Sequence, residues 1–597
     1  MFYTIHKSLI EQGTAKMKNI SYYKEEYPRP QLWRGDYVIL NGEWDFAFGD
    51  GLADEEMQCG FSDRQKIKVP FTYQTSLSGI GIEERHDVVW YSRQIGVEKS
   101  QLAGRVLLHL EGCDYQTFVW VNGTFVGSDC GGYHRLTFDC TSALHEGDNN
   151  LTIKVCDDYS VEKPRGKQRS KDTNYGCWYT DTTGIYKTIW IEFVPESYVK
   201  NLVIEADAGA GRATLNCEIA GEGSEVTAKI TYGGRQVALG KAEVTGNVAT
   251  VNVDLAAEEP LHLWSLTDPS LYEVELSLFK SGEAVDKVQS YFGVRSIKIK
   301  DGKIYLNDKE LYQKLALDQG YWRDGLLTPP GEQALIDDIV DMADMGFNGV
   351  RKHQKVEDER YLYYADIMGF IVWAEMPSMY LNTENSRKVF EREWLLAVSQ
   401  QRNHPSVLTW VPFNESWGVE EIRTNKIVQD FVNDIYYKTK EIDSTRPVIT
   451  NDGWEHTISD ILTIHHYEQD GEKLRSYFDT IEKCYAPKWT NHDRGAFADG
   501  YGYNGQPIII SEFGGTAFVS DTVGENWGYG VGVKNLEEFY SRFASLIDAI
   551  DSLPYSCGYC YTQVTDVQQE VNGLLDFDHK SKFDKERIRS ILNKNGR

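Results

Sequence analysis

The second half of the chain alternates short apolar runs with amphipathic segments, and this alternation limits the possible folds more than any other feature. Eight candidate strands follow residue 295: Tyr312–Leu317, Phe347–Arg351, Phe370–Glu375, Val407–Phe413, Pro447–Asn451, Ile461–His466, Ile508–Glu512 and Ser556–Thr562. Between them, apolar residues recur at helical spacing in Glu332–Met345, Val389–Arg402, Glu420–Ile442 and Leu536–Ser552. Eight such units predict a parallel (β/α)₈ TIM barrel, whose active site forms at the C-terminal ends of the strands. An open doubly wound sheet is the alternative, but "LALDQGYW" lacks its Gly-rich phosphate turn.

The residues before the barrel are typical of β structure. From about Trp33 to Val194, short β-rich runs such as "VLLHLEGC" and "NNLTIKVCDD" are separated by turns, and Asn122-Gly123 is a strong hairpin signal. This pattern predicts an all-β sandwich. From about Pro195 to Val294 a second series of strands with frequent Gly breaks predicts an immunoglobulin-like sandwich. We therefore expect three domains, over residues 1–194, 195–294 and 295–597.

Composition narrows the class of partner. The chain has 62 basic and 90 acidic side chains, a formal charge of -28, which would repel nucleic-acid phosphates and anionic membrane surfaces. No run approaches the roughly 20 apolar residues of a membrane-spanning helix. The segment Met1–Arg34 has no apolar run of the kind found in secretory signals. The ten cysteines are scattered along the chain, which is the pattern of reduced thiols rather than of a disulfide framework. We expect a cytoplasmic protein with no nucleic-acid or membrane partner.

Two of the predicted strands end in a glutamate. Glu415 follows "SVLTWVPFN", and Glu512 follows "PIIIS". A carboxylate directly after a buried strand is costly to desolvate, so it either pairs with a cation or performs chemistry. Two carboxyl groups about 5–5.5 Å apart are what a retaining glycosidase uses. Mutual repulsion would then raise the pKa of one and keep Glu415 protonated while Glu512 stays ionised. From spacing alone, ion pairing with a barrel-mouth Arg or Lys is the alternative.

The sequence resembles glycoside hydrolase family 2, which contains β-galactosidases, β-glucuronidases and β-mannosidases. The resemblance covers almost the whole chain and rests on "LNGEWDF", "WYSR", "GCDYQTFVWVNG", "LWSLTDPSLY", "FGVR", "MGFNGVRKH", "WVPFNESWG" and "IIISEFGG" in the family's order. It implies a jelly-roll sugar-binding domain, an immunoglobulin-like domain and a catalytic TIM barrel, with retention of anomeric configuration. It also implies that Glu415 is the acid/base and Glu512 the nucleophile.

The resemblance implies further substrate-site residues. Asn414 would bind the sugar 2-OH, Arg351 would help keep Glu512 ionised, and Tyr467 would hydrogen-bond to Glu512. Less specific candidates are His353, one residue closer to the arginine than usual, His466, Tyr561, Asp318 and Trp527, each of which has packing or an ordinary polar contact as its alternative. No cofactor is expected. Some relatives bind Mg²⁺ or Na⁺, but no full ligand set is visible here, and many relatives are oligomers, so a homo-oligomer is possible.

The expected activity is removal of a terminal β-linked sugar from a glycoside. Family β-glucuronidases share an Asn-x-Lys element after the last strand, whose lysine meets the substrate carboxylate. Here "QEVNGLLDFDHKSK" keeps Asn572 but has Leu574 in the lysine position. Loss of that charge-assisted bond favours a neutral sugar, above all a β-galactoside. Lys580 or Lys582 could reach in instead, which keeps β-glucuronide or β-galacturonide as the alternative.

A non-catalytic carbohydrate-binding protein is the alternative from another class. The presence of both Glu415 and Glu512 in their expected sequence contexts argues against it.

Overall fold

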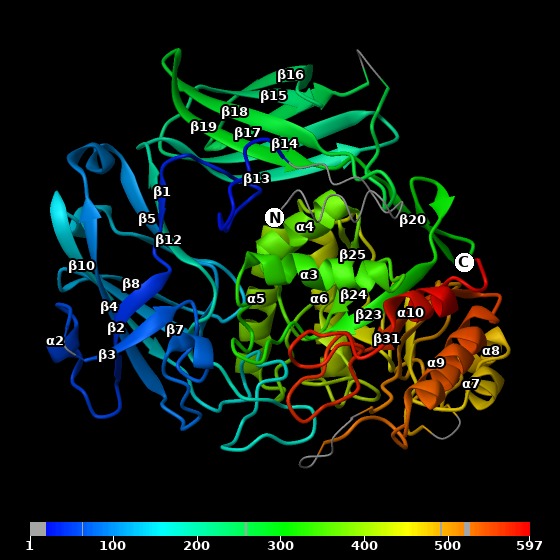
Figure 1. Ribbon diagram of the computed structural model, residues 1–597. Coiled ribbons are helices and arrows are strands. Elements are labelled where there is room, and N and C mark those ends of the chain that lie inside the picture. The colour runs from blue at the N-terminus through cyan, green and yellow to red at the C-terminus, as the bar shows by residue number, and fades with distance from the viewer. Residues whose placement is uncertain (1–19, 63, 257–259, 490–491, 519–525, 597) are drawn as a thin grey trace.

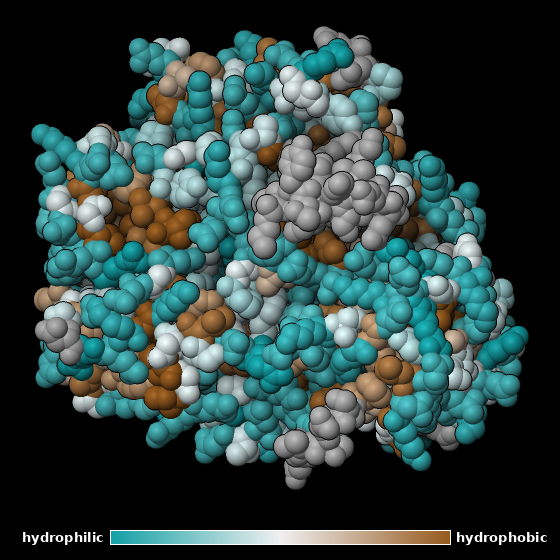
Figure 2. All heavy atoms as spheres, viewed as in Figure 1, coloured by the Kyte–Doolittle hydropathy of each residue, from teal (hydrophilic) through white to brown (hydrophobic). Residues whose placement is uncertain are grey.

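The computed structural model describes residues 20–596 except 63, 257–259, 490–491 and 519–525. Residues 1–19, on which part of the expectation about a secretory signal rests, lie outside the described chain. A first sandwich lies beside a barrel, and a second sandwich lies above both (Figure 1). Hydrophilic residues cover much of the face in Figure 2, with hydrophobic areas over the first sandwich. None of the helices in the described residues is long and apolar enough to cross a membrane.

The first sandwich packs a six-stranded sheet, in the order β3-β2-β4-β10-β7-β8, against a four-stranded sheet, β1-β12-β5-β9. The hairpin predicted at Asn122-Gly123 joins β7 and β8, with φ of 51° and 78° at the two turn residues. The elements are β1 (Tyr37–Ile39), β2 (Gly42–Phe48), α2 (Asp54–Met57), β3 (Gln65–Val69), η1 (Ser76–Ser78), β4 (Val88–Val97), η2 (Lys99–Ala103), β5 (Arg105–Leu110), β6 (Cys113–Asp114), β7 (Gln116–Val121), β8 (Thr124–Cys130), β9 (Leu136–Asp139), η3 (Thr141–Ala143), β10 (Gly147–Cys156), β11 (Gly184–Ile185) and β12 (Ile189–Val194).

The second sandwich packs a three-stranded sheet, β13-β14-β17, against a four-stranded sheet, β16-β15-β18-β19. Its strands alternate buried and exposed positions, as a sheet with one solvated face requires; in β17, Ala249, Val251 and Val253 are the buried ones. The strands are β13 (Tyr198–Asp207), β14 (Arg212–Ala220), β15 (Glu225–Tyr232), β16 (Arg235–Glu243), β17 (Val248–Asp254), β18 (Tyr272–Lys280) and β19 (Glu283–Phe292). A small sheet of β20 (Ile297–Lys300), β21 (Lys303–Leu306) and β22 (Lys309–Glu310) leads into the barrel.

The barrel contains a curled parallel sheet in the order β26-β25-β24-β23-β31-β30-β29. Its strands are β23 (Gln313–Asp318), β24 (Gly349–Lys352), β25 (Ile371–Glu375), β26 (Val407–Val411), β29 (Leu462–His465), β30 (Ile508–Gly514) and β31 (Ser556–Thr562). The fifth unit is shorter than the predicted Pro447–Asn451. Here β28 (Asn451–Asp452) pairs with β27 (Phe413–Asn414), and Val448 forms an isolated parallel bridge with Trp410, while the backbone N–H of Val448 donates to the Asp460 side chain at 2.8 Å.

The barrel helices are α3 (Glu332–Asp344), α4 (Glu359–Met368), α5 (Glu384–Gln401), α6 (Lys426–Ile442), α7 (Gly471–Tyr477), α8 (Ile481–Cys484), α9 (Leu536–Asp551) and α10 (Lys585–Leu592). The predicted starts of two helices were wrong by several residues. Helix α5 begins earlier than expected because Thr383 and Ser386 form a capping box, and α6 begins later because the side chain of Asn425 accepts the N–H of Ile427. Capping hydrogen bonds, rather than apolar spacing, set these helix starts.

Candidate active site

The ends of β27 and β30 bring the two predicted glutamates together. One carboxylate oxygen of Glu415, one of Glu512 and a ring nitrogen of His465 all lie within 4.8 Å of one another. The Glu415 side chain is 19% exposed and that of Glu512 only 5%. The two carboxylates therefore form a largely buried acidic centre, in which Glu415 is more exposed to solvent than Glu512.

Arg351, near the end of β24, is the buried cation that contacts the acidic groups of this centre. Its fully buried guanidinium contacts Glu512 at 2.9 Å, Asp452 at 2.7 Å and Glu375 at 2.5 Å, and donates to Asn414 Oδ1 at 2.7 Å. Burial alone would lower the pKa of Arg351, but the surrounding carboxylates raise it, so the cation is permanent. Glu512 therefore accepts from a fixed positive charge.

Tyr467 supplies the second donor to Glu512. Its hydroxyl lies 2.5 Å from Glu512 Oε2 and 3.0 Å from Thr562 Oγ1. Its ring stacks on Tyr529, with centroids 3.3 Å apart and an interplanar angle of 2°. Burial, with the charge of Glu512, raises the pKa of Tyr467 well above its usual value, so the phenol keeps its proton and donates it in the hydrogen bond.

Glu415 adopts an uncommon backbone conformation. Its φ is 53° and that of Ser416 is 60°, in the left-handed region that side chains with a Cβ disfavour. The turn is held by hydrogen bonds from the Glu415 N–H to the Asp452 carbonyl and from the Ser416 N–H to Asn451 Oδ1, each 2.9 Å long. A strained conformation at a strand end is a common feature of functional sites.

His465 lies between the carboxylates. Its Nδ1 is 2.8 Å from Glu415 and 3.5 Å from Glu512, and its Nε2 is 3.0 Å from Asp452. Burial lowers the pKa of His465, but the charges of Glu512 and Asp452 outweigh burial and raise it to about 10. Burial likewise raises the pKa of Glu415, yet the hydrogen bond and charge of His465 leave it below the usual value.

This environment corrects one expectation. Repulsion between the two glutamates was expected to raise the pKa of Glu415, but the positively charged imidazole between them reverses the direction. The surrounding charges therefore favour the proton on His465 over Glu415.

His353 has the opposite character from His465. Its Nδ1 is 3.0 Å from Arg351 Nη2 and 2.9 Å from Glu375 Oε1. Burial, with the positive charges of Lys167 and Arg351, lowers its pKa well below the usual value. It is a neutral imidazole beside the arginine. Asn414, 1% exposed, also faces Arg351.

The side chains of two predicted site residues contact groups other than the carboxylates of Glu415 and Glu512. Asp318 forms an ion pair with Lys352 at 2.5 Å and accepts the N–H of Gly320. The ring of His466 packs in an aromatic cluster with Tyr477, Phe478 and His492, while its backbone N–H donates to the Glu512 carbonyl.

The two remaining aromatic candidates differ in position. Tyr561 is 1% exposed and its ring packs on Phe543 of α9, at 4.9 Å between centroids, which corrects the expectation that it faces the sugar. Strand alternation turns this residue toward the outer helices. Trp527 is half-buried, and its indole N–H donates to the carbonyl of Gly176, in the first sandwich, at 2.8 Å.

Residues of the centre that the sequence interpretation missed fall into two groups. Asp452, Glu375 and His465 lie at or next to the ends of predicted strands, so the rule that selected Glu415 and Glu512 could have found them. Lys167 had no such signal. It lies between β10 and β11 in the first sandwich, far from the barrel in sequence, and is 9% exposed.

Lys167 reaches the barrel site from residues 157–183, the segment that joins β10 to β11. Its Nζ is 3.2 Å from Cys177 Sγ. No carboxylate forms an ion pair with Lys167 in the described part of the chain. Burial lowers its pKa, but the surrounding groups raise it overall: Cys177 and Tyr380 first, then Glu570 and Glu415. The ammonium is thus a buried cation in the field of the acidic centre.

The group of Glu415, His465 and Glu512 also has the composition of a metal site. We do not assign it as one, because Arg351 already supplies a positive charge 2.9 Å from Glu512, and His465 Nδ1 lies at hydrogen-bonding distance, 2.8 Å, from Glu415.

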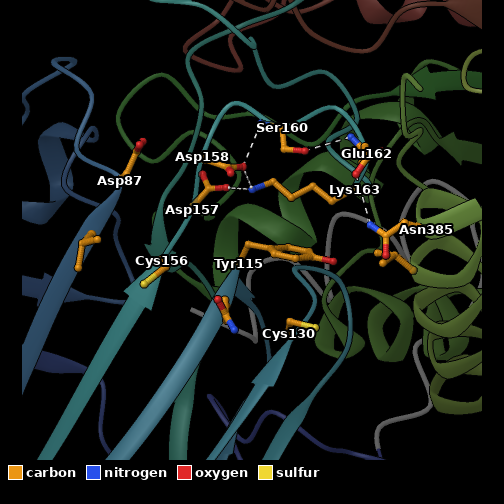
Figure 3. Close-up of a pocket in the computed structure, with 13 residues that line it drawn as sticks. Asp87, Tyr115, Cys130, Cys156, Asp157, Asp158, Ser160, Glu162, Lys163 and Asn385 are labelled. Carbon is orange, nitrogen blue, oxygen red and sulfur yellow. Dashed lines mark hydrogen bonds and ion pairs between the residues drawn. The ribbon is translucent and has the colours of Figure 1, made fainter. Parts of the chain in front are cut away.

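A separate cavity of about 510 Å³ lies where the first sandwich meets α5 (Figure 3). Several of its polar side chains pair with one another: Lys163 with Asp157 and Asp158, and Glu162 with Asn385, from which it accepts. Because neither Glu415 nor Glu512 lines it, this cavity is a weaker candidate than the barrel centre.

Family models match most of the chain. Residues 38–189 match the sugar binding domain of glycosyl hydrolases family 2, residues 197–295 match a second model of that family, and residues 297–527 match its TIM barrel domain. The chain belongs to glycosyl hydrolase family 2.

Relatives differ in their named activities. A putative β-glucuronidase of Formosa agariphila is 23% identical over 68% of this chain and 50% of its own length. A β-galactosidase of Thermoanaerobacter pseudethanolicus is 25% identical over 64% of this chain and 52% of its own length. The chain thus spans about half the length of these relatives.

Solved structures show the same fold. A β-glucuronidase from Ruminococcus gnavus in complex with D-glucuronic acid has a TM-score of 0.76 at 16% identity, over 95% of this chain and all of that one. A β-glucuronidase from Bifidobacterium dentium gives 0.77 at 17% identity, over 95% of this chain and 98% of its own.

Proposed function

We propose that this protein is a retaining, exo-acting β-glycosidase that forms a covalent glycosyl-enzyme, with Glu512 as nucleophile and Glu415 as acid/base. The observation that carries the proposal is that one carboxylate oxygen of Glu415 and one of Glu512 lie within 4.8 Å of each other. Inverting enzymes keep their carboxyl groups about 6.5–9.5 Å apart to admit a water molecule. The shorter distance supports direct attack on the anomeric carbon.

The surroundings of each glutamate fit its proposed role. Glu512 accepts from Arg351 and Tyr467 and has little exposure, which suits an anion that attacks the sugar. Glu415 is more exposed and has a titratable partner, His465, which suits a group that gives up and regains a proton. The proton would pass from Glu415 to the glycosidic oxygen in the first step and return from water in the second.

Exo action is supported by the first sandwich. Residues 157–183 lie along the mouth of the barrel, where Tyr380 donates to the Gly166 carbonyl and Trp527 donates to that of Gly176. Asn174 also donates to Gln568, after the last strand. A segment fixed at several points around the mouth favours a closed pocket for one terminal sugar over an open cleft.

For the sugar, we propose a neutral β-galactoside first. Leu574, in the position of the glucuronidase lysine, is fully buried. Lys582 pairs with Asp566 at 2.8 Å, and Lys580 is 76% exposed, so neither supplies the missing cation in this conformation.

Lys167 favours a second candidate, a β-uronide. It is a buried ammonium without a carboxylate partner among the described residues. The carboxylate of a uronide substrate would form the ion pair that no described protein carboxylate forms with Lys167. Some relatives are named β-glucuronidases, as are the structures of the same fold.

A panel of 4-nitrophenyl β-glycosides that differ only at C4 and C5 tests the proposal. Hydrolysis of the β-galactoside at least tenfold faster than the β-glucuronide and β-galacturonide supports the first candidate; the reverse order selects the uronide. Absence of hydrolysis across the panel, with sugar binding retained, would make the protein a carbohydrate-binding member of the family.

A further inference from the structure

The imidazole of His465 has a carboxylate at each of its two nitrogens. Nδ1 lies 2.8 Å from Glu415 Oε1, and Nε2 lies 3.0 Å from Asp452 Oδ2. An ionised carboxylate can only accept a hydrogen bond, and a neutral imidazole has only one N–H. If both carboxylates are ionised, the ring must carry two protons. If the ring is neutral, one of the two carboxyls must carry the proton for both hydrogen bonds to form. Burial raises the pKa of Asp452, but the charges of Arg351 and His465 lower it overall, so that carboxyl is Glu415.

From this geometry we propose that His465 and Glu415 share one proton and act as a single acid/base unit, in which His465 stores the proton that Glu415 delivers. His465 is a positioning residue here, because it acts on the substrate only through Glu415. The inference rests on the proposed function.

The proton balance closes over the two steps. With substrate bound, the proton moves from His465 Nδ1 to Glu415 Oε1, and the neutral ring keeps its Nε2–H bond to Asp452. The Glu415 carboxyl then gives the proton to the leaving oxygen as Glu512 forms its bond to the anomeric carbon. In the second step Glu415 takes a proton from the attacking water, the bond to Glu512 breaks, and the proton returns to Nδ1.

The surroundings hold the imidazole in this position. Asp452 is fixed by Arg351 at 2.7 Å and by the Ser511 hydroxyl at 2.8 Å. Gly453 has φ of 105°, and a Cβ there would lie 2.6 Å from His465 Nδ1, so only glycine leaves room for the ring. Asp452 therefore anchors one nitrogen while the other faces Glu415.

Several charged or titratable groups face His465 and bear on its protonation. They come from every neighbouring strand end: Glu415 after β27, Asp452 in β28, Glu512 in β30 and Arg351 in β24, with His353, His456 and His492 further out. Burial lowers the pKa of each of these three outer histidines, so they are neutral near pH 7. The anions at short range favour the imidazolium.

The kinetic test compares the wild type with His465→Asn and His465→Gln. These variants retain a hydrogen-bonding group but cannot exchange a proton. The alkaline limb of kcat/KM in the wild type reports loss of the shared proton. We expect it to move at least about one pH unit lower in both variants, because Glu415 then titrates without the stored proton.

The leaving group gives a second kinetic signature. At pH 7 we expect the variants to lose about 10–10²-fold on a phenyl glycoside, which needs protonation, and much less on a 2,4-dinitrophenyl glycoside. His86→Asn, which removes a histidine paired with Asp50 on the first sandwich, is the control. An unchanged alkaline limb in both His465 variants would overturn the inference.

A spectroscopic test does not need turnover. In protein labelled with ¹⁵N-histidine, the signals lost in His465→Asn identify the ring, and both nitrogens should be protonated at pH 7. A neutral ring at pH 7 would overturn the inference even if the enzyme is active. If no glycoside is hydrolysed but the doubly protonated ring is seen, the proposed function fails while the hydrogen-bond arrangement stands.

Discussion

The two glutamates at the barrel mouth have different partners. Glu512 lies between Arg351, whose charge is permanent, and the Tyr467 hydroxyl, and its side chain is only 5% exposed. Glu415 is 19% exposed and its close partner is His465, which can gain and lose a proton. The contrast shows how two identical side chains a few ångströms apart can be specialised: one has partners that keep it charged, and the other has a partner that exchanges protons with it.

The largest effect should come from Glu512. Glu512→Gln removes the attacking carboxylate and keeps the shape, although the amide oxygen can accept from only one of Arg351 and Tyr467. The kcat should therefore fall by about 10⁴-fold or more on every substrate, whatever its leaving group. Steady-state kinetics with phenyl and 2,4-dinitrophenyl glycosides measure this loss. Glu537→Gln, on the exposed face of α9, is the matched control. If Glu512→Gln were selectively active on the good leaving group, the two roles would be reversed.

The Glu415 variant should be less damaged and more selective. Glu415→Gln cannot donate a proton, so hydrolysis of phenyl glycosides should fall by about 10²–10⁴-fold. Cleavage of 2,4-dinitrophenyl glycosides should fall least in its first step, because that leaving group needs little protonation. A pre-steady-state burst of dinitrophenol, followed by slow turnover, is the expected signature. An equal loss on both substrates would contradict the assignment of Glu415 as acid.

The Tyr467→Phe variant tests how much the hydroxyl that donates to Glu512 contributes to kcat. Tyr467→Phe removes the hydroxyl that donates to Glu512 but keeps the ring stacked on Tyr529, so kcat should fall by about 10²-fold with little change in melting temperature. Tyr436→Phe, which removes a hydroxyl that donates to Asp460 on the outside of the barrel, serves as control. A loss below threefold would mean that Arg351 alone suffices to keep Glu512 reactive.

Lys167 should give the smallest effect if the substrate is a neutral sugar. Lys167→Met should then change kcat/KM on the β-galactoside by no more than about threefold, because a sugar hydroxyl offers an ammonium only an ordinary hydrogen bond. Lys171→Met, on the same segment but exposed, is the control. A selective loss of about tenfold or more on a β-uronide, with that sugar the fastest in the panel, would instead identify the carboxylate as the group that Lys167 recognises.

The fold was largely predictable because strand and helix periods are local properties of the sequence. The two sandwiches, the barrel and the hairpin at Asn122-Gly123 follow from such patterns. The errors occurred where side chains compete with the backbone. In the fifth unit the Asp460 side chain accepts the N–H of Val448, and Val448 keeps an isolated bridge to Trp410 in place of a regular strand. Thr383 and Asn425 set helix starts that apolar spacing does not mark.

The site was predictable in part. Parallel strand ends meet at one rim, which is why Glu415, Glu512 and Arg351 come together as expected. The direction in which each side chain points was harder to predict from the sequence. A shift of one residue along a strand turns a side chain to the other face of the sheet, as at Tyr561. His465 was overlooked in favour of His466 for the same reason. Lys167 lies in another domain, and only tertiary structure brings it to the barrel.

The stereochemistry of hydrolysis tests the central claim most directly. Proton NMR of the first-formed sugar, recorded before mutarotation, distinguishes a covalent glycosyl-enzyme from direct attack by water. The account predicts that the β-anomer appears first and that a 2-fluoro glycoside with a good leaving group labels the peptide containing Glu512. First appearance of the α-anomer would contradict the two-glutamate retaining mechanism, however close the carboxylates lie.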